Sequence, residues 1–98
     1  MAAQLAGQEP GQTGSYFLDE ASHLLAALRL WAQSRFRTDQ VVRELLELAD
    51  VVALNSIARQ LEELGTPEGH TASRSVALIA SRPSGELMAT AGYALRAL

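Results

Sequence analysis

The chain has 98 residues, of which 48% are hydrophobic and 19% charged, a composition typical of a folded protein rather than a disordered one. Its 8 basic residues are all arginine and are outnumbered by 11 acidic residues, and the formal net charge of −3 argues against a non-specific polyanion binder. Cysteine is absent, which excludes disulfides, thiolate metal ligands and cysteine nucleophiles.

The first fourteen residues differ in composition from the rest of the chain. They are rich in Gln, Gly and Ala around Pro10, with too little apolar surface to offset the entropy of ordering. We therefore predict a flexible N-terminal tail over residues 1–14 and a single helical domain over residues 15–98. Because neither a secretory signal nor a bilayer-spanning apolar run is visible, a cytoplasmic location without a membrane partner is expected.

The first predicted helix covers residues 15–34. Placing successive residues about 100° apart gives one continuous apolar arc, the pattern of a helix that packs one face on a core. The arc predicts the core residues of this helix, which are Phe17, Ala21, Leu24, Leu25, Leu28, Trp31 and Ala32.

Glu20 and His23 lie three residues apart in this helix, a spacing that carboxylate-bridged metal proteins use on helices. The helical projection places His23 opposite the apolar arc and Glu20 at its margin. Metal ligands of helical bundles project into the core instead, and the second histidine, His70, falls in a glycine-flanked loop. The sequence therefore assigns no metal ligand and no cofactor, and a metal-binding helical protein using Glu20 and His23 is kept as an alternative.

The second helical region covers residues 39–64, with Thr38 or Asp39 as the expected cap and Gly65 as the stop. Its apolar face changes direction half way, and one straight helix cannot bury both faces against a single partner. Either an unbroken helix packs on two partners, one of them in a second subunit, or the helix breaks near Asn55 or Ser56. The first face comprises Val41, Val42, Leu45, Leu48, Ala49 and Val52, and the second comprises Val51, Leu54, Ile57, Ala58, Leu61 and Leu64.

The residues after Gly65 give weaker signals. Thr66 suits the cap and Pro67 the first position of a helix, but Gly69 weakens a helix that starts there. The apolar run over residues 76–80 is too short for periodicity to separate a strand from a helix. Residues 84–98 are predicted to be helical, with Ser84 as the cap.

No local signature of catalysis is present in the sequence. Nothing matches a positioned nucleophile and base, and no glycine-rich loop of the kind that holds phosphate occurs. The sequence therefore predicts a protein that is not an enzyme.

A break near Asn55 would divide the second region into a helix, a turn and a helix, and residues 74–87 could then form a β-hairpin. This order of elements resembles the winged helix-turn-helix family across residues 17–98. The resemblance implies a DNA-binding regulator whose helix over residues 55–64 enters the major groove. Its reading residues would be Asn55, Ser56, Arg59 and Gln60. Against it, this helix carries Glu62 and Glu63.

The favoured interpretation is an all-α bundle of three to four helices. A domain this small buries only part of its apolar surface, and self-association would cover the remainder, most commonly in a two-fold dimer. We therefore expect a non-enzymatic homodimer that acts by binding another protein, as an adaptor, accessory subunit or regulator. The expected interface residues are Val41, Leu45, Leu48 and Val52.

Overall fold

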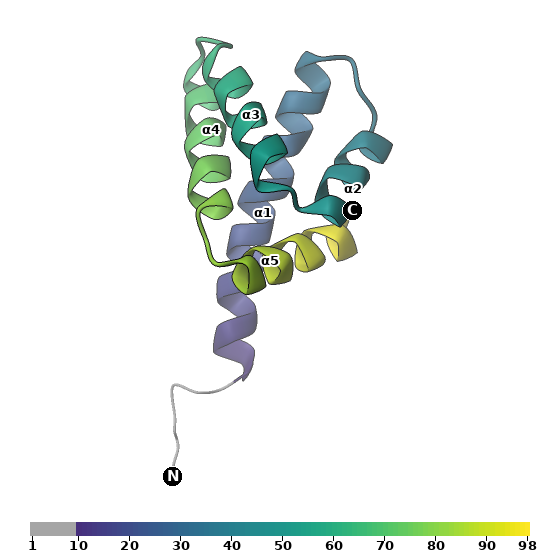
Figure 1. Ribbon diagram of the computed structural model, residues 1–98, viewed down its shortest axis with the longest axis vertical. Helices are drawn as coiled ribbons and strands as arrows, with labels where there is room; N and C mark the ends of the chain where they lie inside the picture. Colours follow the sequence, from purple (N-terminus) through teal and green to yellow (C-terminus); the bar gives the residue numbers. More distant parts are fainter. Residues whose placement is uncertain (1–9) are drawn as a thin grey trace.

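A computed structural model describes residues 10–98 and places them in five α-helices, with no strand in that range (Figure 1). The helices are α1 (Pro10–Ser34), α2 (Asp39–Leu48), α3 (Val51–Glu62), α4 (Pro67–Ala80) and α5 (Ser84–Ala97). The all-α prediction is confirmed, with five helices in place of three to four. Of the predicted tail, residues 1–9 lie outside the described residues, and residues 10–14 belong to α1.

The long helix α1 is the centre of the fold and contacts each of the other four helices. Helices α3 and α4 form an antiparallel pair on one side of it, while α2 packs against α1 and α5. Figure 1 shows α5 crossing one end of the bundle, so that the C-terminus lies beside the α2–α3 corner.

The core residues of α1 lie on the predicted arc, except for Ala27, which is buried although the prediction did not include it. Ala21, Leu24, Leu25, Leu28 and Ala32 are buried, because the arc faces the other four helices. Phe17 and Trp31, which the arc also includes, are half-buried. Each of the other helices adds buried apolar residues to the same cluster, among them Val42, Leu61, Val76 and Leu87.

The helix break between α2 and α3 lies at Ala49 and Asp50, before the position expected from Asn55 or Ser56. Ala49 adopts the left-handed conformation with φ of 47°, and the Asp50 carboxylate accepts a hydrogen bond from the Val52 N–H at 3.1 Å. Asp50 is therefore the cap, because its side chain satisfies one of the free amides of the new helix. Asn55 and Ser56 lie inside α3.

This break removes the conflict between the two apolar faces within one chain. Val42 and Leu46 of α2 and the four buried residues of α3, Leu54, Ile57, Ala58 and Leu61, all join a single core. The change of face therefore does not require a second subunit. Self-association would instead bury apolar side chains that the monomer leaves exposed.

The turn between α3 and α4 confirms three predictions. Gly65 follows the end of α3 and has a left-handed φ of 69°. Thr66 Oγ1 accepts a hydrogen bond from the Gly69 N–H at 3.0 Å, and Pro67 is the first helical residue of α4. Gly69 does not interrupt the helix. A Cβ atom at Gly69 would lie 2.6 Å from the Leu61 carbonyl oxygen, so this glycine allows α4 to approach the α3 backbone.

The predicted β-hairpin near residues 74–87 is wrong. Helices α4 and α5 occupy these residues, and only residues 81–83 connect them. Val76, Ile79 and Ala80 are buried at helical spacing, which the short apolar run alone could not reveal. Pro83 is the cap residue of α5, and no side-chain bond from Ser84 caps that helix.

Candidate interaction site

An apolar groove of about 320 Å³ lies where the α2–α3 corner meets α5. Helix α2 and the corner contribute one wall, which ends in Leu48, Ala49 and Val51, and α5 contributes the other. We call this feature the corner groove. It is lined by Leu46, Glu47, Leu48, Ala49, Val51, Ser84, Leu87, Met88, Ala91, Gly92 and Leu95.

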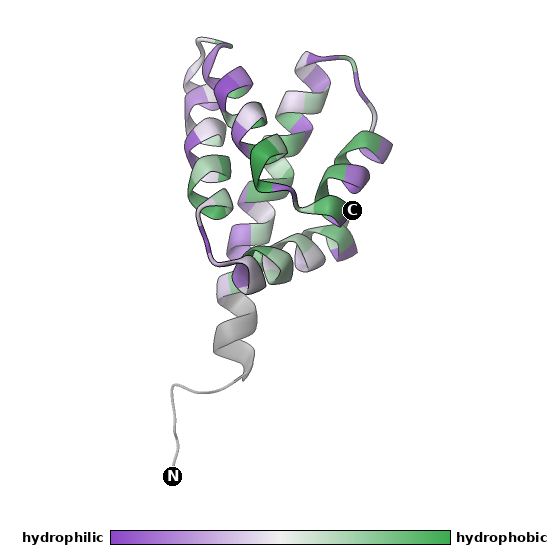
Figure 2. Cartoon of the chain, viewed as in Figure 1, coloured by the Kyte–Doolittle hydropathy of each residue, from purple (hydrophilic) through white to green (hydrophobic). Residues whose placement is uncertain are grey.

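Large apolar side chains are exposed around the corner groove. Leu48 is 75% exposed, Val52 77% and Met88 66%, and Val51 is exposed as well. Figure 2 shows hydrophobic residues gathered on the end of α2, the start of α3 and α5, around the C-terminus. Contiguous apolar surface of this kind usually marks an interaction site in a folded domain.

The structure separates the four residues predicted as the dimer interface. Leu48 lines the corner groove, and Val52 is exposed at the start of α3 without lining the groove. Leu45 packs against the core instead and is half-buried, as is Val41. The end of α2 and the corner, rather than the start of α2, therefore form the exposed surface beside α5.

Sequence reasoning missed Val51 and Met88 as members of this surface. Met88 lies off the arc by which α5 is buried, which comprises Leu87, Thr90, Ala91 and Ala94. The sequence signal for Met88 was a large apolar residue outside this arc. The sequence held no such signal for Val51, because the exposure of Val51 depends on where the helix breaks.

The α2 side of the corner groove is acidic. Glu47 lines the groove, Glu44 lies one turn earlier on the same side of α2, and Asp50 is at the corner, all of them exposed. Arg43 is the basic residue nearby in the sequence, so residues 43–50 carry a net charge of −2. A partner for this groove should combine an apolar group with positive charge.

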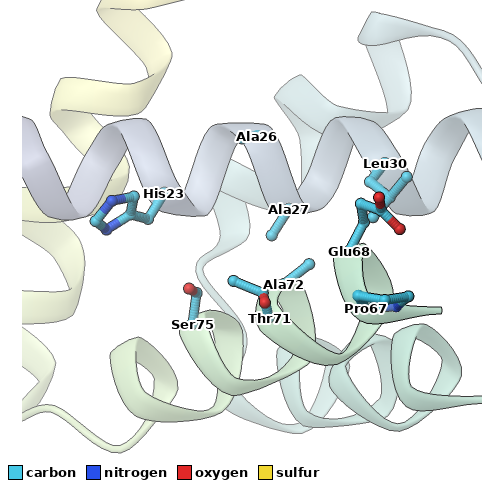
Figure 3. Close-up of a pocket in the computed structure, with 9 residues that line it drawn as sticks. All are labelled: His23, Ala26, Ala27, Leu30, Pro67, Glu68, Thr71, Ala72 and Ser75. Carbon is cyan, nitrogen blue, oxygen red and sulfur yellow. The ribbon is translucent and has the colours of Figure 1, made fainter.

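A second, larger groove of about 530 Å³ separates α1 from α4 (Figure 3). His23 and Ser75 lie towards one end of it, and Leu30 and Glu68 lie towards the other, with alanines between them. No hydrogen bond in the described part of the chain joins His23 to Ser75 or to Glu68. The groove therefore does not present the hydrogen-bonded nucleophile and base that covalent catalysis uses.

Glu20 and His23 are not brought together as a metal site. The Glu20 carboxylate is largely buried and accepts a hydrogen bond from Arg82 Nη2 at 3.2 Å, while His23 is exposed in the α1–α4 groove. Arg82 also lies over the Tyr16 ring, 5.6 Å from its centroid. Among residues 10–98 no cluster of three or more His, Asp or Glu side chains could hold a metal ion. Glu20 instead ties α1 to the loop before α5.

Of the four residues expected to read DNA in the winged-helix alternative, two are exposed and two are half-buried. Asn55 and Arg59 are exposed on α3. Gln60 Oε1 accepts a hydrogen bond from Trp31 Nε1 at 2.9 Å, and Gln60 Nε2 donates to Ser56 Oγ at 3.2 Å. Gln60 therefore fastens α3 to α1, and Ser56 holds the Gln60 amide, so both side chains already have partners within the fold.

Within the described helices, none is both long and apolar enough to cross a membrane. Comparisons of the chain with protein-family models, with curated proteins and with solved structures found no match. Function is therefore inferred from the geometry and chemistry of this chain.

Proposed function

We propose that this protein is a non-enzymatic helical interaction module that forms a homodimer through the surface of the corner groove and acts by binding another protein. The observation that carries the proposal is the exposure of Leu48, Val51 and Met88 in one apolar groove, with Val52 exposed next to Val51 in the chain. In a two-fold dimer the same patch is used twice, so a small surface covers both copies.

The expected affinity follows from the size of the patch. Each large apolar side chain contributes about 1.5–3 kcal/mol when it is fully buried. Four such residues on each of the two copies give about 12–24 kcal/mol, against about 4–15 kcal/mol for the lost freedom of two molecules. The midpoints of these ranges differ by about 8 kcal/mol, which corresponds to a dimer with a Kd in the micromolar range.

The partner of the dimer is another protein, for which this chain serves as an adaptor, accessory subunit or regulator. The absence of a hydrogen-bonded nucleophile and base in the α1–α4 groove supports a binding role over a catalytic one. The all-α fold and the internal bonds of Ser56 and Gln60 favour protein binding over the DNA-binding alternative.

The test is sedimentation velocity with native mass spectrometry over about 1–100 μM protein, the range set by the expected Kd. Leu48→Arg should give a monomer with unchanged helical circular dichroism. Leu78→Arg is the matched control, because Leu78 is also an exposed leucine but lies on α4 away from the corner groove. A wild-type protein that stays monomeric, or a Leu48→Arg protein that stays dimeric, would overturn the proposal.

A further inference from the structure

The turn between α1 and α2 carries a fully exposed aromatic side chain. Phe36 is 97% exposed, and its backbone has a left-handed φ of 57°. The Phe36 N–H donates to the Gln33 carbonyl at 3.2 Å, and the Arg37 N–H donates to the Ala32 carbonyl at 2.8 Å. These two bonds form the Schellman motif that ends α1, and Phe36 occupies the position that glycine usually takes.

Phe36 is an unfavourable choice for folding in two ways. A left-handed backbone costs free energy for any residue with a Cβ, and a phenyl ring in water adds exposed apolar surface without contributing to the core. Strained backbone and exposed aromatics that the fold does not need are more often explained by function.

Two arginines flank Phe36. Arg35 and Arg37 are both exposed, and neither forms an ion pair within residues 10–98. An aromatic ring beside arginine is the composition of the residues that dominate protein interfaces. We call Arg35, Phe36 and Arg37 the anchor, and its net charge is +2.

The anchor and the corner groove are complementary but lie at opposite ends of α2. The anchor is apolar and basic, while the corner groove is apolar with acidic residues around it. Helix α2 has 10 residues and is therefore about 15 Å long, so a chain cannot fold its own anchor into its own groove.

We propose that Phe36 of one copy inserts into the corner groove of a second copy, against Leu48 and Met88. Arg35 and Arg37 then face Glu44 and Glu47 across the interface. In a closed two-fold dimer this contact forms twice, once in each direction. The inference rests on the homodimer proposed above and names the segment that occupies its groove.

The first experiment measures dimer dissociation of Phe36→Ala by sedimentation velocity. The variant keeps the backbone strain and the fold but removes the ring from both contacts, so Kd should rise at least about a hundredfold. Leu18→Ala is the control, because it removes another exposed apolar side chain from α1 and should leave Kd unchanged. A Phe36→Ala protein that dimerises as tightly as wild type overturns this inference, even if Leu48→Arg confirms the homodimer.

The second experiment exchanges the charges. The double variant Arg35→Glu/Arg37→Glu places an acidic anchor against an acidic groove, and Glu44→Arg/Glu47→Arg places a basic anchor against a basic groove. Each protein alone should be monomeric at concentrations where wild type is dimeric. An equimolar mixture should form a heterodimer, because both contacts then join opposite charges.

Native mass spectrometry resolves the heterodimer from either homodimer by mass. A mixture that stays monomeric while wild type dimerises overturns the reciprocal contact, as does dimerisation of either charge variant alone at wild-type affinity. A ladder of trimers and larger species would also overturn it, because an anchor and groove that do not close on each other extend without limit.

Discussion

The α1–α2 and α3–α4 turns share the same local features, but the residues of the two turns suit these features to different degrees. Both contain a residue with left-handed φ, Phe36 in the first and Gly65 in the second, and both continue into a helix whose N-cap residue is a threonine. In the α3–α4 turn the threonine side chain caps its helix, whereas Thr38 forms no cap bond with α2.

The difference reflects what each turn has to position. The α3–α4 turn joins two helices whose backbones approach closely at Gly69, so the residues of this turn suit both its backbone conformation and the packing of the helices. The α1–α2 turn is exposed, and packing does not constrain its side chains. A residue unfavourable for the turn is tolerated there, and this is where an interaction element can be placed at little cost to the core.

The largest expected effect lies at Gly69. Gly69→Ala should lower the free energy of unfolding by about 2–3 kcal/mol, because the new Cβ meets a backbone oxygen that cannot move without shifting α3. Urea denaturation followed by circular dichroism measures it. Gly85→Ala is the control, since a Cβ there meets nothing within 4 Å. Equal stability of the two variants would show that the helices separate easily and that the α3–α4 turn is no tighter than the other.

The two N-cap threonines should differ in their contribution to stability, by a smaller amount than the two glycines. Thr66→Ala should cost about 1 kcal/mol, because it removes the acceptor of the Gly69 N–H. Thr38→Ala should change stability by less than about 0.5 kcal/mol, since no side-chain bond is lost. Thermal unfolding of both variants tests this difference, and a Thr38→Ala protein as unstable as Thr66→Ala would remove the contrast between the turns.

Substitution of the two residues with left-handed φ should change stability in opposite directions. Phe36→Gly should raise stability by about 1 kcal/mol by relieving backbone strain, and Gly65→Ala should lower it by about the same amount. Both are measured by urea denaturation in a Leu48→Arg background, because dimer formation would otherwise add to the apparent stability of wild type.

Phe36→Ala in the same background separates the ring from the backbone, because alanine keeps the strain. If Phe36→Ala stabilises the monomer as much as Phe36→Gly does, the cost of Phe36 lies in its exposed ring and not in backbone strain.

The smallest effects are expected from the exposed polar contacts beside the two turns. Arg29 Nη2 lies 3.4 Å from Asp39 Oδ2 beside the first turn, and His70 Nδ1 lies 3.0 Å from Glu62 Oε2 beside the second. Because the side chains of both pairs are well exposed, Arg29→Ala and His70→Ala should each cost less than about 0.5 kcal/mol and still less at high salt. A cost above 1 kcal/mol at either position, measured at two salt concentrations, would contradict this assessment.

Local signals in the sequence were sufficient for the elements that depend on a few neighbouring residues. The arc of α1 predicted its buried face, and Gly65, Thr66 and Pro67 predicted a helix end, a cap and a helix start that the structure contains. Each of these signals acts within one or two turns of the chain, where backbone conformation and helix capping are decided.

The candidate site was predictable only in part. Leu48 and Val52 were identified because they are apolar on a face that later proved exposed, while Leu45 of the same face packs against the core. Val51, Met88 and Phe36 were not identified. Their exposure depends on how other helices cover them, and a sequence pattern carries no information on that.

The sequence by itself determined the helical class of the chain, the inward face of α1 and the turn at Gly65, because helical periodicity and backbone preferences are properties of neighbouring residues. Only the tertiary structure decided the break at Ala49, the need for glycine at Gly69 and the helical state of residues 76–80. It also decided which apolar residues stay exposed around the corner groove. These features follow from contacts between helices distant in sequence, whose packing overrides weak local preferences.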